Sequence, residues 1–359
     1  MTLALAQRRW LRLAVLLLML LSGPVIAGSC RLAPSNPTIL RPSVPLTGNI
    51  TVGRDLPVGT EIYRREFITT SDFIIQCDPG DYVYHRNFSI TPYPVSSYVH
   101  PTHGAKVYTT PIAGVGAVIL AGGAGALPGV DNMRFTAPTN ATLYAGRQYA
   151  LLLIKIADNV GSGAITGAQF PSPRFRMQGD NTLDFLLGGF TGQVNIVSRT
   201  CTTPDVSVNL GTHQMSALSG VGTGTSWVNV PIRLTNCPAF HARSLTGSYN
   251  DRGQANQTAT ANTIGYRVNP VTSVVNPAQG VMALQPDGVN QTATGIGIQM
   301  VDASNNPLTY GVRRASGLAL TATNNASYTI NLRARYYQTA TTPTSGQANG
   351  AATVTLIYE

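Results

Sequence analysis

The chain has 359 residues, of which 43% are hydrophobic and 11% are charged, and its formal net charge is +9. That length suits two ordinary domains, and the apolar content is too high for a disordered chain. Helical bundles and coiled coils need dense Glu, Lys, Leu and Ala at a helical period, and this Gly- and Pro-rich composition excludes them. An all-β protein is expected. The basic residues are mostly arginines spread along the chain, so nucleic acid is not an expected partner.

Residues 1–27 have the pattern of a secretory signal peptide. A start with three arginines precedes the apolar run 13–21, and small or apolar residues end at Ala27, where cleavage is expected. The run is much shorter than the roughly 20 residues of a membrane-spanning helix. We therefore expect export of a mature chain that begins at Gly28.

Seven later segments alternate apolar and polar residues and are separated by Pro-, Gly- or Asn-rich turns, which is typical of strands. They are residues 62–75, 108–120, 143–156, 192–197, 226–234, 326–332 and 352–358. Many short strands of this kind indicate sandwiches or barrels. A boundary at about 198–200 predicts two such domains, 28–198 and 199–359.

Four cysteines lie in the exported part, and an even number in an oxidising compartment favours disulfides. Three pairings are open, and one bridge per domain is the simplest. We expect Cys30 to pair with Cys77 and Cys201 with Cys237. No CxxC or Cys/His cluster has the spacing of a zinc site, so neither a metal nor a cofactor is expected.

Catalytic motifs fail on inspection. The glycine-rich stretch 117–129 lacks the third glycine and the following helix of a dinucleotide-binding loop, so a hairpin is the better interpretation. No G-x-S-x-G or H-E-x-x-H motif occurs. We expect a protein that is not an enzyme.

Residues 82–108 gather rings and cationic groups between turns. Flat amphipathic rings suit carbohydrate faces or a protein epitope, so this segment is the candidate receptor surface. An ordinary sheet with surface histidines is the alternative interpretation, and His100 with His103 alone is a weak metal pair. The candidates are Tyr82, Tyr84, His85, Arg86, Tyr93, Tyr98, His100 and His103.

The C-terminus carries the most specific pattern. In residues 353–359 the apolar Val354, Leu356 and Tyr358 share one face, and a terminal strand presents its edge to whatever pairs beside it. The segment resembles the final strand of pilin domains of chaperone-usher fimbriae, with its penultimate tyrosine. The resemblance extends over the stretches 206–212, 295–302 and 332–358, together with both cysteines of the second half.

The first half is similar to the receptor-binding half of two-domain tip adhesins, closest to those of type 3 fimbriae. The stretches that carry this likeness are 52–60, 106–116, 160–167 and 192–201. A shaft pilin has an extension of ten to twenty residues before its first cysteine, and here only Gly28 and Ser29 precede Cys30. The chain is therefore expected to accept a strand and not to donate one, which suits a fimbrial tip.

The resemblance implies an incomplete immunoglobulin-like pilin domain with an open hydrophobic groove. A periplasmic chaperone would lend a strand, and at the outer-membrane usher the extension of an adjacent pilin subunit would replace it. Val354, Leu356 and Tyr358 would line this groove, and the chaperone would hold the terminal carboxylate at Glu359. An ordinary core strand is the compatible alternative. The isolated first half should fold, whereas the isolated second half should not.

The resemblance also implies a host receptor, with an exported protein displayed at the fimbrial tip. Mannose-specific relatives begin with an aromatic residue, and Gly28 departs from that pattern. A host matrix protein or its glycan is the expected receptor. Two alternatives remain: a non-adhesive minor pilin and a secreted β-sandwich protein that acts on glycans.

Overall fold

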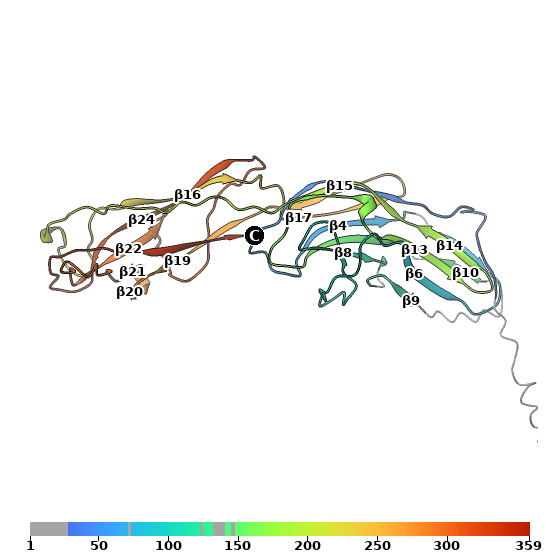
Figure 1. Cartoon of the computed structure of the whole chain (residues 1–359), viewed down its shortest axis with the longest axis horizontal. Helices are drawn as coiled ribbons and strands as arrows, with labels where there is room; N and C mark the ends of the chain where they lie inside the picture. Colours follow the sequence, from blue (N-terminus) through green and yellow to red (C-terminus); the bar gives the residue numbers. More distant parts are fainter. Residues whose placement is uncertain (1–27, 71–72, 123–124, 132–140, 145–147) are drawn as a thin grey trace, which may run out of the picture.

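A computed structural model describes residues 28–70, 73–122, 125–131, 141–144 and 148–359, and the expected signal peptide lies outside them. The described chain is built of β-strands and short 3₁₀ helices, as the composition predicts. The 3₁₀ helices are η2 (Gly167–Gln169), η3 (Met215–Ala217) and η4 (Pro277–Gln279). None of the described helices has the length and apolarity to cross a bilayer. Figure 1 shows two lobes arranged in line, with the C-terminus between them.

Four sheets enclose the hydrophobic core of the first lobe. The first contains β1 (Cys30–Leu32), β5 (Ile74–Cys77) and β10 (Ala141–Tyr144). The second contains β14 (Thr182–Leu187), β13 (Ser172–Gln178), β6 (Val83–Ile90) and β9 (Gly129–Asp131). The third contains β12 (Gly163–Thr166), β15 (Gly189–Val197), β2 (Ser43–Leu46) and β3 (Asn49–Thr51). The fourth contains β18 (Thr258–Thr260), β17 (Ser244–Asn250), β4 (Glu61–Ile68), β11 (Tyr149–Lys155), β8 (Val115–Leu120) and β7 (Tyr108–Thr109).

Two sheets enclose a separate core in the second lobe. The larger contains β16 (Val228–Cys237), β24 (Ala326–Gln338), β22 (Ile296–Asp302), β21 (Val281–Met282) and β20 (Val274–Asn276). The smaller contains β23 (Arg314–Ala315), β19 (Ile264–Pro270) and β25 (Ala352–Tyr358). Alternating inward residues of both sheets supply the core, as in a β-sandwich.

One hairpin of the second half joins the first lobe. Strand β17 runs parallel to β4, with Leu245 opposite Tyr63 and Asn250 opposite Ile68, so that it extends the fourth sheet. Its partner β18 forms the outer edge of that sheet. The side chain of Leu245 is 7% exposed and belongs to the first core. The two lobes are therefore joined by a shared sheet as well as by the chain that connects them.

Three of the seven expected strands are each divided in two. The segment 62–75 forms β4 and β5, which lie in different sheets, because the polar Thr69 and Thr70 interrupt the pattern and the backbone N–H of Thr70 donates to Asp251. Segment 108–120 similarly forms β7 and β8, and 143–156 forms β10 and β11. The expected strand 352–358 is β25 without change. The glycine-rich stretch turns back on itself through an antiparallel bridge from Leu120 to Ala126, as a hairpin does.

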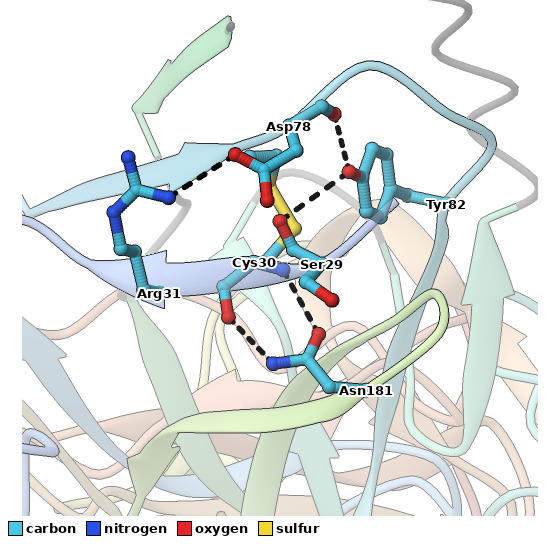
Figure 2. Close-up of a disulfide and its surroundings, with 7 residues drawn as sticks. Ser29, Cys30, Arg31, Asp78, Tyr82 and Asn181 are labelled. Carbon is cyan, nitrogen blue, oxygen red and sulfur yellow. Dashed lines mark hydrogen bonds and ion pairs between the residues drawn. A yellow bond between two sulfur atoms is a disulfide. The ribbon is translucent and has the colours of Figure 1, made fainter. Parts of the chain in front are cut away.

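Both expected disulfides are present, Cys30–Cys77 and Cys201–Cys237. The first bridge anchors the start of the described chain (Figure 2): the Asn181 side chain accepts from the Cys30 N–H at 2.9 Å and donates to its carbonyl oxygen at 2.7 Å. The hydroxyl of Tyr82 donates to the carbonyl oxygen of Asp78 beside it. These bonds make the bridge part of a packed unit rather than an isolated crosslink.

Candidate functional site

The last strand of the chain leaves one edge open. β25 pairs with β19 on one side and ends its sheet on the other. Ala351 and Glu359 hydrogen-bond toward β19. Because backbone groups in an antiparallel strand alternate in direction, the even-numbered residues between them turn their N–H and C=O groups to the open side. Val354, Leu356 and Tyr358 therefore turn their backbone groups to that side, while their apolar side chains pack on or in the core of the second lobe.

The segment opposite β25 also lacks a strand partner among the described residues. Residues 203–210 follow the disulfide at Cys201 and form no assigned strand. Val206, Val208 and Leu210 alternate with polar residues, which is a strand pattern, yet Val206 is 36% exposed. Two extended segments with strand-like sequences thus face each other without pairing.

A groove of about 940 Å³ with an apolar floor separates these two segments. Its floor is made by inward-facing residues of the larger sheet of the second lobe, most of which are buried members of the core of this lobe. The floor residues are Val230, Ile232, Met282, Ile298, Met300, Ala334 and Tyr336. A strand with alternating apolar side chains is the kind of segment that pairs with an open sheet edge beside an apolar floor.

The four C-terminal candidates take two positions. Val354, Leu356 and Tyr358 line the groove, and burial raises the pKa of the Tyr358 hydroxyl, which keeps it neutral. That hydroxyl accepts from the backbone N–H of Cys201 at 3.3 Å. Glu359 lies past the end of β25, where Thr263 exchanges two backbone hydrogen bonds with it and Arg313 pairs with its carboxylate at 2.6 Å.

The aromatic candidates of the first half divide into core and surface residues. Tyr82 and Tyr84 are 2% and 9% exposed, and Tyr84 packs against Phe175 and Phe185. Tyr82 lies directly before β6 and Tyr84 lies on it, and both side chains are part of the core. On the same strand His85 is half-buried, and Arg86 is buried with its guanidinium 5.5 Å from the Tyr84 ring. These four residues therefore build the sheet.

Tyr98, His100 and His103 form a separate cluster on a turn beside β4. The two imidazoles stack at 4.6 Å, and the Tyr98 ring meets His100 edge-on at 6.3 Å. The Nδ1 of His100 accepts from the backbone N–H groups of Thr102 and His103, which fixes the turn. Tyr93, also half-buried, lies apart, with its hydroxyl 3.5 Å from the Gln169 amide nitrogen.

Burial lowers the pKa of His103, and nearby His100 and Arg64 act in the same direction. No group of His, Cys, Asp and Glu suited to a metal ion occurs in the described ranges. The cluster of Tyr98, His100 and His103 forms a half-exposed ring surface. Exposed Val99 lies in the same turn, at 63% exposure.

Sequence reasoning missed two buried cations, of which Arg65 links the first lobe to the hairpin of the second half. Arg65 is 3% exposed and donates to the carbonyl oxygens of Pro45 and, at 2.7 Å, Asn256. The ammonium of Lys155 is fully buried and donates to three carbonyl oxygens of the loop that follows β3. The one signal in the sequence was a charged residue at the end of a continuous apolar run, at Lys155.

Comparisons with known proteins agree with this layout. The family model described as MrkD-like receptor binding domain matches residues 46–187, and the model described as Fimbrial protein matches residues 189–359. The fimbria adhesin protein of Klebsiella pneumoniae is 26% identical over 320 residues, which cover 87% of this chain and 89% of that protein. The fimbrial subunit type 1 of Salmonella typhimurium is 29% identical over 158 residues, 43% of this chain and 71% of that protein.

Two solved structures are also similar. The CupB6 tip adhesin from Pseudomonas aeruginosa shares 14% identity with a TM-score of 0.36 and covers 92% of this chain and 94% of its own. The receptor binding domain of the adhesin MrkD1P of Klebsiella pneumoniae shares 21% identity with a TM-score of 0.34, over 49% of this chain and 98% of its own.

The all-β fold and the two adjoining family matches define a fimbrial protein. More narrowly, the chain belongs to the fimbrial adhesins, in which a MrkD-like receptor-binding domain precedes a fimbrial protein domain.

Proposed function

We propose that the protein is the tip adhesin of a chaperone-usher fimbrium, with a receptor-binding domain at 28–198 and a pilin domain at 199–359. The observation that carries the proposal is the open edge of β25 across a groove with an apolar floor from the unpaired segment 203–210. An edge strand with unpaired backbone groups is a ready template for pairing with a strand of another chain. A strand from a partner is the occupant that satisfies both the edge and the groove.

The partners follow from this arrangement. A periplasmic chaperone covers the groove during export, and an adjacent pilin subunit supplies the permanent strand at the outer-membrane usher. The protein is then displayed at the fimbrial tip, at the cell surface. Its role is attachment rather than catalysis, and its receptor is a host matrix protein or a glycan.

We propose a narrower receptor surface within residues 82–108. Tyr82, Tyr84 and Arg86 are committed to the core, whereas Tyr98, His100 and His103 present half-exposed rings. Aromatic rings that are rigid and partly exposed are effective anchors for sugar faces and protein epitopes. We assign the receptor contact to this second group.

Two binding assays test the proposal. The whole exported chain is applied to an array of matrix proteins and glycans, and Tyr98→Ala should weaken capture while the melting temperature stays unchanged. For the groove, chaperone co-purification is compared between Val354→Arg, which places a charge in the groove, and Thr329→Arg on an exposed position of β24. Loss of chaperone only in Val354→Arg supports strand acceptance, and equal recovery of both variants argues against it.

A further inference from the structure

The groove is closed at one end by a loop of the first lobe. Residues 53–55 follow β3 and lie against the end of β25, and among the described residues of the first lobe Arg54 alone lines the groove. The Arg54 guanidinium donates to the carbonyl oxygen of Leu356 at 3.1 Å and lies 6.0 Å from the Tyr358 ring centroid. The loop therefore touches both the backbone and a side chain of the groove wall.

Asp55 completes this contact with two hydrogen bonds. Its backbone N–H donates to the carbonyl oxygen of Tyr358 at 3.2 Å, and its carboxylate accepts from the Tyr358 N–H at 2.9 Å. Both backbone groups of Tyr358 belong to the open edge of β25. Asp55 thus pairs with the last edge residue much as a neighbouring strand would.

The pairing that remains for an incoming strand is correspondingly short. On the open edge, the loop engages the carbonyl of Leu356 and both groups of Tyr358. The groups left are those of Ala352 and Val354, with the N–H of Leu356. A strand that fills the groove meets the loop at this point and cannot continue along β25 without displacing it.

The buried side chain of Lys155 holds the loop 53–55 in place. The buried ammonium of Lys155 donates to the carbonyl oxygens of Gly53, Arg54 and Leu56, at 3.3, 2.6 and 2.7 Å. Three charge-assisted bonds from one buried group fix the loop to β11, in the central sheet of the first lobe. Gly53 lies so close to the Tyr358 carbonyl that a Cβ would clash with it.

We propose that residues 53–55 are an end stop of the strand-acceptor groove, which sets how far along β25 the partner's strand extends. The inference rests on the proposed function, because it assumes that the occupant is a β-strand. It adds that the receptor-binding half itself forms part of the acceptor site. The end of the bound strand contacts Arg54, so the partner's strand touches both lobes.

Hydrogen exchange of individual amides, followed by NMR, tests the stop in the unmodified whole chain. The Tyr358 amide should be protected before any strand is added, because Asp55 already accepts from it. The Val354 and Leu356 amides should exchange quickly and become protected only when a strand binds. A Tyr358 amide that exchanges quickly in the free protein and slows on binding would overturn the proposal.

Peptide affinity gives a second test. The probes are a synthetic peptide of about seven alternating valines and threonines, and longer peptides extended by about four residues at either end. Unmodified protein should bind short and long probes within about twofold. The double variant Arg54→Ala/Asp55→Ala frees the Leu356 carbonyl and the Tyr358 N–H, so one long probe should bind about fivefold more tightly than the short one.

The matched control is Arg31→Ala/Asp78→Ala, which removes an exposed ion pair beside the first disulfide (Figure 2). It should behave as the unmodified protein does. A fivefold preference for a long probe in the unmodified protein, or none in the double variant, would refute the end stop while leaving strand acceptance intact. If no probe binds the unmodified protein at any concentration, the proposed function fails together with the inference.

Discussion

The shared hairpin makes Leu245 a test of how the two lobes depend on each other. Leu245 belongs by sequence to the fimbrial protein domain, yet its side chain, 7% exposed, packs in the core of the first lobe. Truncation of a buried leucine to alanine costs about 3 kcal/mol, from lost apolar burial and from the cavity that remains. Leu245→Ala should therefore destabilise the first lobe by about that amount.

Urea unfolding can separate the lobes because residues 28–359 contain one tryptophan. Trp227 lies in the second half, and the Arg335 guanidinium stacks on it at 4.3 Å. Tryptophan fluorescence during urea unfolding reports the second lobe, and circular dichroism reports both. Leu245→Ala should lower the circular dichroism midpoint of the first lobe and leave the fluorescence midpoint in place. Thr246→Ala, at the exposed neighbouring position, is the control. It should change the free energy of unfolding of either lobe by no more than about 0.5 kcal/mol.

If Leu245→Ala shifted only the fluorescence transition, or neither transition, Leu245 would not contribute to the core of the first lobe. The same structure refines the expectation for the isolated first half, residues 28–198. That fragment should fold, but without β17 it exposes the edge of β4 and leaves Arg65 without its bond to Asn256. We expect it to be less stable than the first lobe of the whole chain and more prone to self-association.

Three further predictions concern the first lobe. Tyr84→Ala should cost about 3 to 5 kcal/mol of stability and leave receptor affinity per folded molecule unchanged. Tyr98→Ala should weaken receptor binding by about 2 kcal/mol at constant melting temperature. If instead Tyr84→Ala weakened binding and Tyr98→Ala only lowered stability, the receptor surface would lie on β6. Because burial lowers the pKa of His103 in the fold, the unfolded chain binds that proton more readily, so stability should fall as the pH drops below about 6.5. His103→Gln should reduce this loss of stability when melting temperatures are measured from pH 8 to about 5. If the melting temperature of the variant fell with pH as steeply as that of the unmodified protein, His103 would not be the titrating group. Lys155→Met leaves three carbonyl oxygens without their donor and should cost about 3 kcal/mol in urea unfolding; a cost below about 1 kcal/mol would show that water replaces the ammonium.

The parts of the site that are local in the sequence could be predicted from it. The alternation of Val354, Leu356 and Tyr358 at the C-terminus defines one apolar face, and this strand appears where it was expected. The pairing of the four cysteines followed from their separation into two halves. Both features depend on residues within a short stretch or on simple counting.

The parts that depend on distant pairing could not be predicted. Residues 244–250 are mainly polar or small, and they become a strand because β4 offers them an edge. The alternation at the start of β6 placed Tyr82 and Tyr84 on one face of the chain. Alternation alone does not say whether that face packs in the core or is exposed. The contact of Asp55 with Tyr358 joins residues that are 303 positions apart.

The central claim is that the groove beside β25 accepts a strand, and the stability of the second lobe tests it most directly. Unfolding of the whole chain is followed by Trp227 fluorescence at increasing concentrations of the alternating valine and threonine peptide, with a scrambled peptide that clusters its valines as the control. The second lobe should gain about 2.7 kcal/mol when the peptide is present at a hundred times its dissociation constant, while the control peptide should have little effect. A fluorescence midpoint that does not move with peptide concentration, or that moves equally with the scrambled sequence, would contradict the central claim.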